Sequence, residues 1–245
     1  MLHSDFGVII EARMNSSRLP GKVLYDFGGI KSLELMIRRI GLVFPVNSIL
    51  VATTESVNDD ALVKFLQKNS INVFRGSEHD VMDRVLKAAK QLDKNYIVSL
   101  TGDCPLIDSR IIESMIRRFN SAGLEYMSNF SPPSYPDGME VQIFSNGCLE
   151  KIENLSRSDH ECEHVGLVVR NNSDFFRSEN YFAPEAETWP NLGLTLDEEA
   201  DAILIRQVLD YFYPKLDFSC ASIIKFLKKN PDLTFLNSNV ERRYS

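Results

Sequence analysis

The sequence has 245 residues, of which 44% are hydrophobic and 25% are charged, and its formal net charge is −7. This length and composition fit one globular α/β domain, and the acidic balance, without a stripe of basic and aromatic residues, argues against nucleic acid as a partner. No run of 18 or more apolar residues occurs, so we expect no membrane span and a cytoplasmic location. The four cysteines are widely spaced and indicate neither a zinc knuckle nor a disulfide framework.

Apolar strand patterns alternate with helical patterns over about the first 130 residues, which predicts βαβ units and a mainly parallel sheet. The predicted strands cover residues 6–10, 48–53, 72–74 and 96–100. The predicted helices begin with Ser32 as a cap, at residues 58–60, at about Asp80 and after Asp108.

The segment ARMNSSRLPGK, residues 12–22, follows the first predicted strand directly. Arg13, Arg18 and Lys22 supply three permanent cations that can oppose several phosphate charges together. Pro20 and Gly21 fix a turn whose backbone can approach an anion closely. We therefore predict a polyphosphate site here, with a solvated basic loop as the alternative. The spacing is not that of a Walker loop, which disfavours ATPase or GTPase chemistry.

The alternation is interrupted by the proline-rich loop at residues 131–138, after which residues 139–144 read as a strand. We expect one domain over residues 1–245, in which residues 129–190 form an inserted lobe that caps a substrate or pairs with a second subunit. A late strand is predicted at 192–197, followed by a helix and by a final helix capped by Ser219.

Two aspartates are expected where strands end at the sheet edge. Ligands of an open parallel sheet lie beyond the carboxyl ends of its strands, where Asp103 follows the strand at 96–100. Magnesium on a nucleotide takes one or two protein carboxylates. We expect Asp103 as the first ligand and Asp197 as the second, with a helix N-cap as the alternative for Asp197.

Further polar residues are expected at the same edge. Thr53 and Thr54 follow the second predicted strand, and Arg75 and Ser77 follow the third. They could bind a nucleobase or ribose, or be ordinary turn formers. Arg84 could join them from the next helix or be solvated.

The segment HECEH, residues 160–164, has the spacing of inverted zinc peptidases. Such a site needs a further ligand, and the chain has only four histidines, so we do not expect zinc. Glu163 and His164 belong instead to an acceptor pocket, to a subunit interface or to a solvated helix.

Seven motifs occur in order along the chain. They are ARxxSxRLPGK at 12–22, VATT at 51–54, FRGSExDV at 74–81, TGDCPLID at 101–108, YPxGxEV at 135–141, EHV at 163–165 and LTLD at 194–197. With these motifs the chain resembles the cytidylyltransferases of the spore coat polysaccharide biosynthesis type. That group is related to the enzymes that activate Kdo and N-acylneuraminate as CMP-sugars.

The resemblance implies a Rossmann-like nucleotidyltransferase fold of the GT-A-like kind, CTP as the donor, Mg²⁺ held by Asp103 and Asp197, and a homodimer formed through the inserted lobe. It implies that Arg13 and Lys22 grip the triphosphate. The expected nucleotide contacts are Ala12, Arg13, Ser17, Arg18, Lys22, Thr53, Thr54, Arg75, Ser77, Arg84, Thr101 and Asp103. The expected insert matches the Kdo and neuraminate enzymes poorly, so the resemblance does not imply the acceptor. From the residues themselves, the expected acceptor contacts are Tyr135, Asp137, Glu140 and His164, with a structural role as the alternative for Tyr135 and His164.

The working hypothesis is attack by a hydroxyl of an acidic sugar, such as an ulosonic or nonulosonic acid, on the α-phosphorus of CTP, with release of pyrophosphate, in surface polysaccharide biosynthesis. Catalysis would rest on positioning and charge neutralisation by Arg13, Lys22 and Asp103. One alternative is a glycosyltransferase of similar fold with a nucleotide-sugar donor, which generally has a D-x-D motif where this chain has Asp103 by itself. The other alternative is a non-catalytic CTP-binding module.

Overall fold

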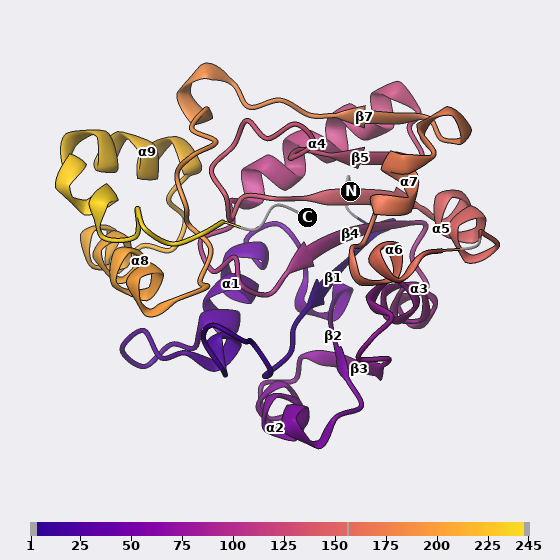
Figure 1. The fold of residues 1–245 in the computed structure, drawn as a ribbon, viewed down its shortest axis with the longest axis horizontal. Helices are drawn as coiled ribbons and strands as arrows, with labels where there is room; N and C mark the ends of the chain where they lie inside the picture. The colour runs from indigo at the N-terminus through magenta and orange to yellow at the C-terminus, as the bar shows by residue number, and fades with distance from the viewer. Residues whose placement is uncertain (1–3, 156, 243–245) are drawn as a thin grey trace.

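The computed structural model describes residues 4–155 and 157–242, which form a seven-stranded sheet with the strand order β3-β2-β1-β4-β6-β5-β7 (Figure 1). The strands are β1 (Phe6–Glu11), β2 (Ile49–Thr54), β3 (Asn72–Gly76), β4 (Tyr96–Thr101), β5 (Tyr126–Ser128), β6 (Gln142–Ser145) and β7 (Ser178–Asn180). β3, β2, β1 and β4 are parallel, β6 runs antiparallel to both β4 and β5, and β7 is parallel to β5. The predicted mainly parallel sheet is confirmed.

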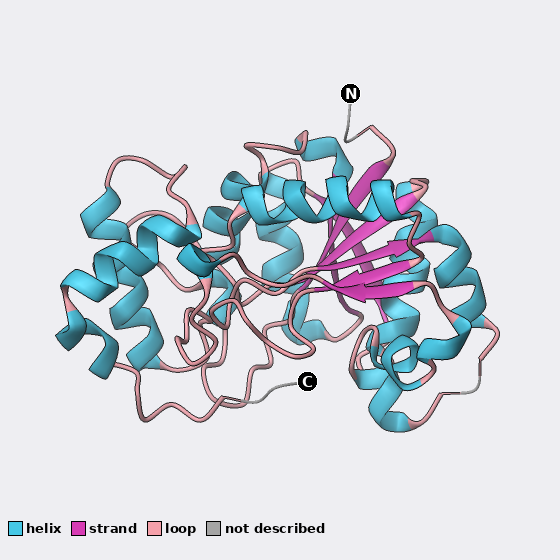
Figure 2. Cartoon of the chain, turned by 90° about the horizontal axis from the view of Figure 1, so that it is seen from above, coloured by secondary structure: helices cyan, strands magenta, loops and turns pink. Residues whose placement is uncertain are grey.

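Helices cover both faces of the sheet (Figure 2). In β1, Val8 and Ile10 enter one apolar core and Ile9 enters the other, because successive side chains of a strand point to opposite faces. The first core packs against α1 (Ser32–Ile40), α2 (Asp60–Lys68), α4 (Ser109–Ala122), α8 (Glu199–Phe212) and α9 (Cys220–Lys229). The second packs against α3 (Val81–Leu92), α5 (Asn146–Glu153) and α7 (Leu167–Asn171), and the short α6 (Asp159–Glu163) contacts α3.

Side-chain caps fix the start of several helices. Asp80 accepts a hydrogen bond from the backbone N–H of Asp83 at 2.7 Å, and Ser219 accepts one from Ser222 at 3.1 Å, as the sequence predicts for Ser219. The predicted cap at Ser32 is wrong. Lys31 is the N-cap residue, and Ser32 is already helical, with a buried hydroxyl that has no partner among the described residues.

Two predicted strands differ in the structure. The strand expected at 139–144 begins only at Gln142, and residues 192–197 are irregular except for an isolated bridge between Gly193 and Asp137. Gly138, with φ of 104°, lets the two segments approach, since a Cβ there would lie 2.7 Å from the carbonyl carbon of Leu194. β6 and β7, which lie within the expected insert at 129–190, belong to the main sheet, and the insert as a separate lobe stays a prediction.

Among the described residues, no helix combines the length and apolar character that crossing a bilayer requires.

Arg39 on α1 is a buried charge that joins three parts of the chain. Its side chain is only 2% exposed and donates hydrogen bonds to the carbonyl oxygens of Leu106, Ile107, Leu216 and Phe218. Its guanidinium lies 4.0 Å from the centre of the Phe218 ring. Burial lowers the pKa of Arg39 to about 10, which leaves the group charged at neutral pH. Arg39 therefore holds α1, the loop after β4 and the segment before α9 together.

Replacing Arg39 with methionine should lower the free energy of unfolding by about 3 kcal/mol, because the carbonyl groups that it pairs would be left buried without donors. Urea denaturation measures this. Arg38→Met is the matched control on the same helix, since Arg38 is exposed and pairs with Glu34 one turn away on the surface, and should change stability by less than about 0.5 kcal/mol. Equal losses of unfolding free energy in the two variants would contradict the role of Arg39 in holding the three segments together.

Candidate functional site

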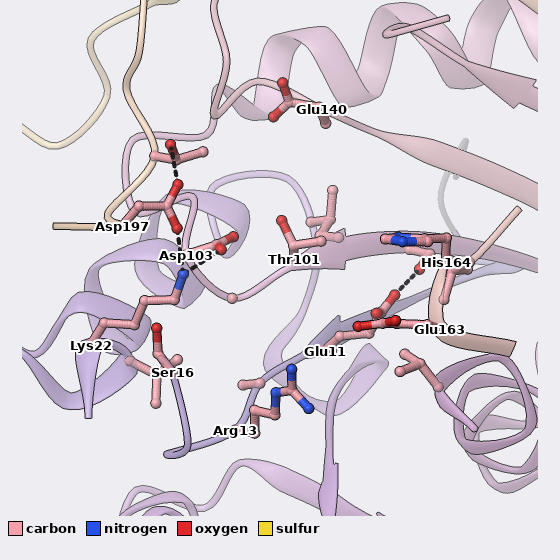
Figure 3. Close-up of a pocket in the computed structure, with 18 of the residues that line it drawn as sticks. Glu11, Arg13, Ser16, Lys22, Thr101, Asp103, Glu140, Glu163, His164 and Asp197 are labelled. Atoms are coloured by element: carbon pink, nitrogen blue, oxygen red, sulfur yellow. Dashed lines mark hydrogen bonds and ion pairs between the residues drawn. The ribbon is translucent and has the colours of Figure 1, made fainter. Parts of the chain in front are cut away.

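A cavity of about 420 Å³ opens at the carboxyl ends of β1 and β4. The chain leaves β1 for β2 on one side of the sheet, while β4 lies on the other side of β1, so this is the switch point at which open α/β sheets bind ligands. The loops after β1 and β4, the loop before α8 and the segments at 137–142 and 163–165 all reach it. Figure 3 shows Lys22, Asp103 and Asp197 toward one side of the cavity, and Glu11, Glu163 and His164 toward the other.

Lys22 lies between two carboxylates at the first of these sides. Its Nζ donates to Asp103 Oδ2 at 2.7 Å and to Asp197 Oδ1 at 2.8 Å (Figure 3). Burial by itself would lower the pKa of Lys22, but the two carboxylates outweigh it and raise that pKa above its ordinary value. Burial likewise opposes ionisation of Asp103, and Lys22 overcomes it and lowers the pKa of Asp103. Lys22 and Asp103 are therefore both charged at neutral pH.

The other cations of the first loop face the same region. Arg18 Nη2 lies 3.2 Å from Asp197 Oδ2, and Arg18 Nη1 lies 3.5 Å from a carboxylate oxygen of Glu198. Arg13 lines the cavity (Figure 3). Ala12, Ser17 and Thr101, which we predicted as nucleotide contacts, also line it.

Asp197 is not the cap of α8. The N-cap residue is Glu198, while the carboxylate of Asp197 is directed at Lys22 and Arg18. The structure thus disfavours the helix-cap alternative for Asp197 and brings it beside Asp103.

The groups around Lys22 include two carboxylates, which are suitable ligands for a hard divalent cation that is also held by phosphates. Two carboxylates converge on one positive group, which is the protein contribution that Mg²⁺ bound to phosphates needs. No cluster of three or more His, Cys, Asp or Glu side chains suited to a metal occurs in residues 4–155 and 157–242.

The two histidines of the HECEH segment, His160 and His164, lie with ring centres 4.5 Å apart at the end of α6.

Glu11, Ser99 and Arg84 form a polar cluster that lines the cavity on the face of the sheet covered by α3, and the sequence analysis named only Arg84 of the three. Ser99 donates a hydrogen bond to Glu11 Oε1 at 3.0 Å, and Arg84, 2% exposed, contributes a guanidinium whose Nε has no hydrogen-bond partner among the described residues. Burial raises the pKa of Glu11 to about 7, although Arg84 acts against it. The sequence indicates this cluster only by Glu11 at the end of the apolar strand β1 and Ser99 within the apolar strand β4.

Asp137, Glu140 and His164, which we predicted as acceptor contacts, line the cavity, together with Gln142 and Glu163. Glu140 accepts a hydrogen bond from the backbone N–H of Gly138 at 2.6 Å, and burial raises its pKa well above the ordinary value. Burial also lowers the pKa of His164, so its ring is neutral at pH 7. Tyr135 does not line the cavity, because it is 4% exposed and packs in the first apolar core.

Thr53 and Thr54 do not line the cavity either. Both are buried, and their hydroxyls donate to Asp59 Oδ2 at 2.9 and 2.5 Å. The other oxygen of Asp59 accepts the backbone N–H of Met14 at 2.7 Å. The threonines therefore support the loop after β1 from behind.

Arg75 and Ser77 lie at a separate surface hollow. Arg75 pairs with Asp60 at 2.8 Å and donates to the carbonyl oxygens of Thr54 and Ser56. Ser77 accepts the backbone N–H of Asp80. Arg84, by contrast, lines the main cavity, apart from Thr53, Thr54, Arg75 and Ser77, and is 2% exposed rather than solvated.

Comparisons with known proteins agree on one family. The family model described as cytidylyltransferase matches residues 7–179. The spore coat polysaccharide biosynthesis protein SpsF of Bacillus subtilis is 31% identical over 94% of this chain and 96% of that protein. A 3-deoxy-manno-octulosonate cytidylyltransferase of Hydrogenovibrio crunogenus is 32% identical over 56% of each chain. The solved structure of a cytidylyltransferase from Leptospira borgpetersenii superposes with a TM-score of 0.88 at 33% identity, covering 99% of this chain and 100% of that one.

Replacing Glu11 with glutamine should stabilise the fold more at pH 8 than at pH 5. The folded chain keeps a proton on Glu11 up to a pKa of about 7, whereas the ordinary value is 4.5. The free energy of unfolding of the wild type is therefore not reduced by Glu11 below pH 4.5. It falls, by up to about 3 kcal/mol, as the pH rises through 7 and Glu11 must ionise in the folded chain. Urea denaturation at both pH values measures this. Glu150→Gln, at an exposed position, is the control, and a Glu11→Gln effect independent of pH would contradict the burial argument.

Proposed function

The chain belongs to the cytidylyltransferase family, and on that premise we propose that it transfers CMP from CTP to a hydroxyl of an acidic sugar, releasing pyrophosphate, in the synthesis of a surface polysaccharide. The observation that carries this proposal is the Lys22 ammonium held between Asp103 and Asp197 at the carboxyl edge of the sheet. This edge joins a cationic loop to two carboxylates, the groups that a triphosphate and its counter-ion require.

The donor end is built from charges that can exchange partners. Lys22 and Arg18 neutralise Asp103 and Asp197 in the structure. With CTP bound, these cations would turn to phosphate oxygens, leaving the two carboxylates for Mg²⁺. Bound there, Mg²⁺ would supply charge neutralisation at the reacting phosphate. Arg13, from the same loop, would bind a further phosphate oxygen. Positioning and charge balance account for most of the catalysis in such transfers.

The acceptor end suits a polyhydroxylated substrate. Asp137, Glu140, Gln142, Glu163 and His164 line that part of the cavity with hydrogen-bonding groups. The name of the Hydrogenovibrio relative specifies a sugar acid as its acceptor, and the name of SpsF specifies polysaccharide biosynthesis. These names support the proposed acceptor class. Burial raises the pKa of Asp137 to about 6, which suits it to receive the proton of the attacking hydroxyl.

The homodimer and the cytoplasmic location stay predictions. Sedimentation of the purified chain tests the first, and fractionation of the cells that contain it tests the second.

Asp103→Asn and Asp197→Asn should each lower pyrophosphate release at least about 100-fold, because each removes a carboxylate from the proposed Mg²⁺ site. The assay supplies CTP, Mg²⁺ and a panel of sugar acids. Asp83→Asn, at a carboxylate that pairs with Lys87 outside the cavity, is the matched control and should keep the wild-type rate. Release of a nucleoside diphosphate from a nucleotide-sugar, without pyrophosphate release from CTP, would contradict the proposal and favour a glycosyltransferase.

A further inference from the structure

Asp201, in the first turn of α8, has a fully buried carboxylate whose two oxygens serve different segments. Oδ2 accepts the backbone N–H groups of Asp197 at 3.0 Å and of Glu198 at 2.9 Å. Oδ1 accepts hydrogen bonds from Asn237 Nδ2 at 2.8 Å and from Arg242 Nη2 at 2.7 Å. Asp201 therefore joins the backbone of the Asp197 loop to the segment at residues 237–242, which we call the C-terminal strap.

The strap makes further contacts with the same loop. Asn237, 5% exposed, also donates to the carbonyl oxygen of Gly193 at 3.0 Å. Arg242 Nη1 donates to the hydroxyl of Thr195 at 3.0 Å. Gly193 leaves the room that this arginine occupies, since a Cβ there would lie 2.1 Å from Arg242 Cζ. In Figure 1 the yellow C-terminal segment runs from α9 toward the middle of the molecule.

Contacts also join the strap to the carboxylates of Asp197 and Asp137. The Thr195 hydroxyl, which accepts from Arg242, lies 3.1 Å from Asp197 Oδ2 and 3.3 Å from Asp137 Oδ2. The guanidinium of Arg242 is 4.0 Å from Asp197 and 3.8 Å from Asp137. On the neighbouring residue, the carbonyl oxygen of Glu241 accepts a hydrogen bond from Arg18 at 2.7 Å. The strap thus touches both the cationic loop and the carboxylate loop.

We propose that Arg242, Asn237 and Asp201 are positioning residues, which act on the reaction by fixing the direction of the Asp197 carboxylate. Arg242 is not among the described residues that line the cavity, and its hydrogen bonds go to Asp201 and Thr195, so we expect it to act mainly through those two residues. The inference rests on the proposed role of Asp197 in holding Mg²⁺ with CTP. Outer partners of metal-binding carboxylates commonly change metal affinity 10- to 100-fold when they are removed.

The direction in which Arg242→Gln changes Mg²⁺ binding distinguishes a positioning role from a purely electrostatic one. Arg242 is a cation close to a proposed cation site, so its charge alone opposes Mg²⁺ there. If charge were its whole role, Arg242→Gln would tighten Mg²⁺ binding. If Arg242 positions Asp197, the same variant weakens it.

The test is the Mg²⁺ concentration that gives half of the thermal stabilisation by CTP, which needs no acceptor and no turnover. For Arg242→Gln we expect this concentration to rise about 10-fold. Arg242→Lys should recover part of the loss, and Asn237→Ala should move the value in the same direction by less, which keeps the test usable if Arg242→Gln folds poorly. Arg206→Gln is the matched control on α8, because Arg206 binds the carbonyl oxygen of Asp26 away from Asp197.

An unchanged or lower Mg²⁺ requirement in both Arg242→Gln and Asn237→Ala would overturn the inference while the wild type still bound CTP with Mg²⁺. Absence of any Mg²⁺-dependent stabilisation by CTP in the wild type would instead overturn the proposed function, and the inference with it.

Discussion

The bridge that Lys22 makes between Asp103 and Asp197 is the interaction on which the rest of the site depends. Two carboxylates this close to one point repel each other unless a cation lies between them. The three residues come from the loops after β1 and β4 and from the segment before α8. They meet because β1 and β4 are parallel neighbours, so that their carboxyl ends open on the same edge.

Much of the fold follows from short-range rules. Alternating apolar and helical periods placed the βαβ units, because burial on both faces of a parallel sheet leaves that pattern in the sequence. The Ser219 cap was readable since it depends on a hydrogen bond only three residues away. Loops after strands likewise indicated where Arg13, Lys22 and Asp103 would gather. The strand predicted at 192–197 is wrong, because its alternating leucines pack in the apolar core while its backbone makes one isolated bridge and no strand pairing with other described residues.

The rest of the site depends on contacts that sequence spacing does not encode. Thr53 and Thr54 turn to Asp59, which in turn holds Met14 in the loop after β1. Glu11 joins Ser99 only because β1 and β4 are paired. The C-terminal strap is the least predictable part, because nothing in the local sequence of Arg242 indicates a contact with the buried carboxylate of Asp201, 41 residues away. Such networks join residues that are far apart in the chain, and a single sequence gives no measure of their distance.

The central claim is that the Lys22, Asp103 and Asp197 cluster binds CTP with Mg²⁺. The most direct measurement is thermal stabilisation of the wild-type chain by CTP, UTP, ATP and GTP, each with and without Mg²⁺, since a ligand that binds the native state raises its apparent stability. We predict stabilisation that is largest for CTP and that depends on Mg²⁺. Equal stabilisation by all four nucleotides, or none by CTP, would contradict the account.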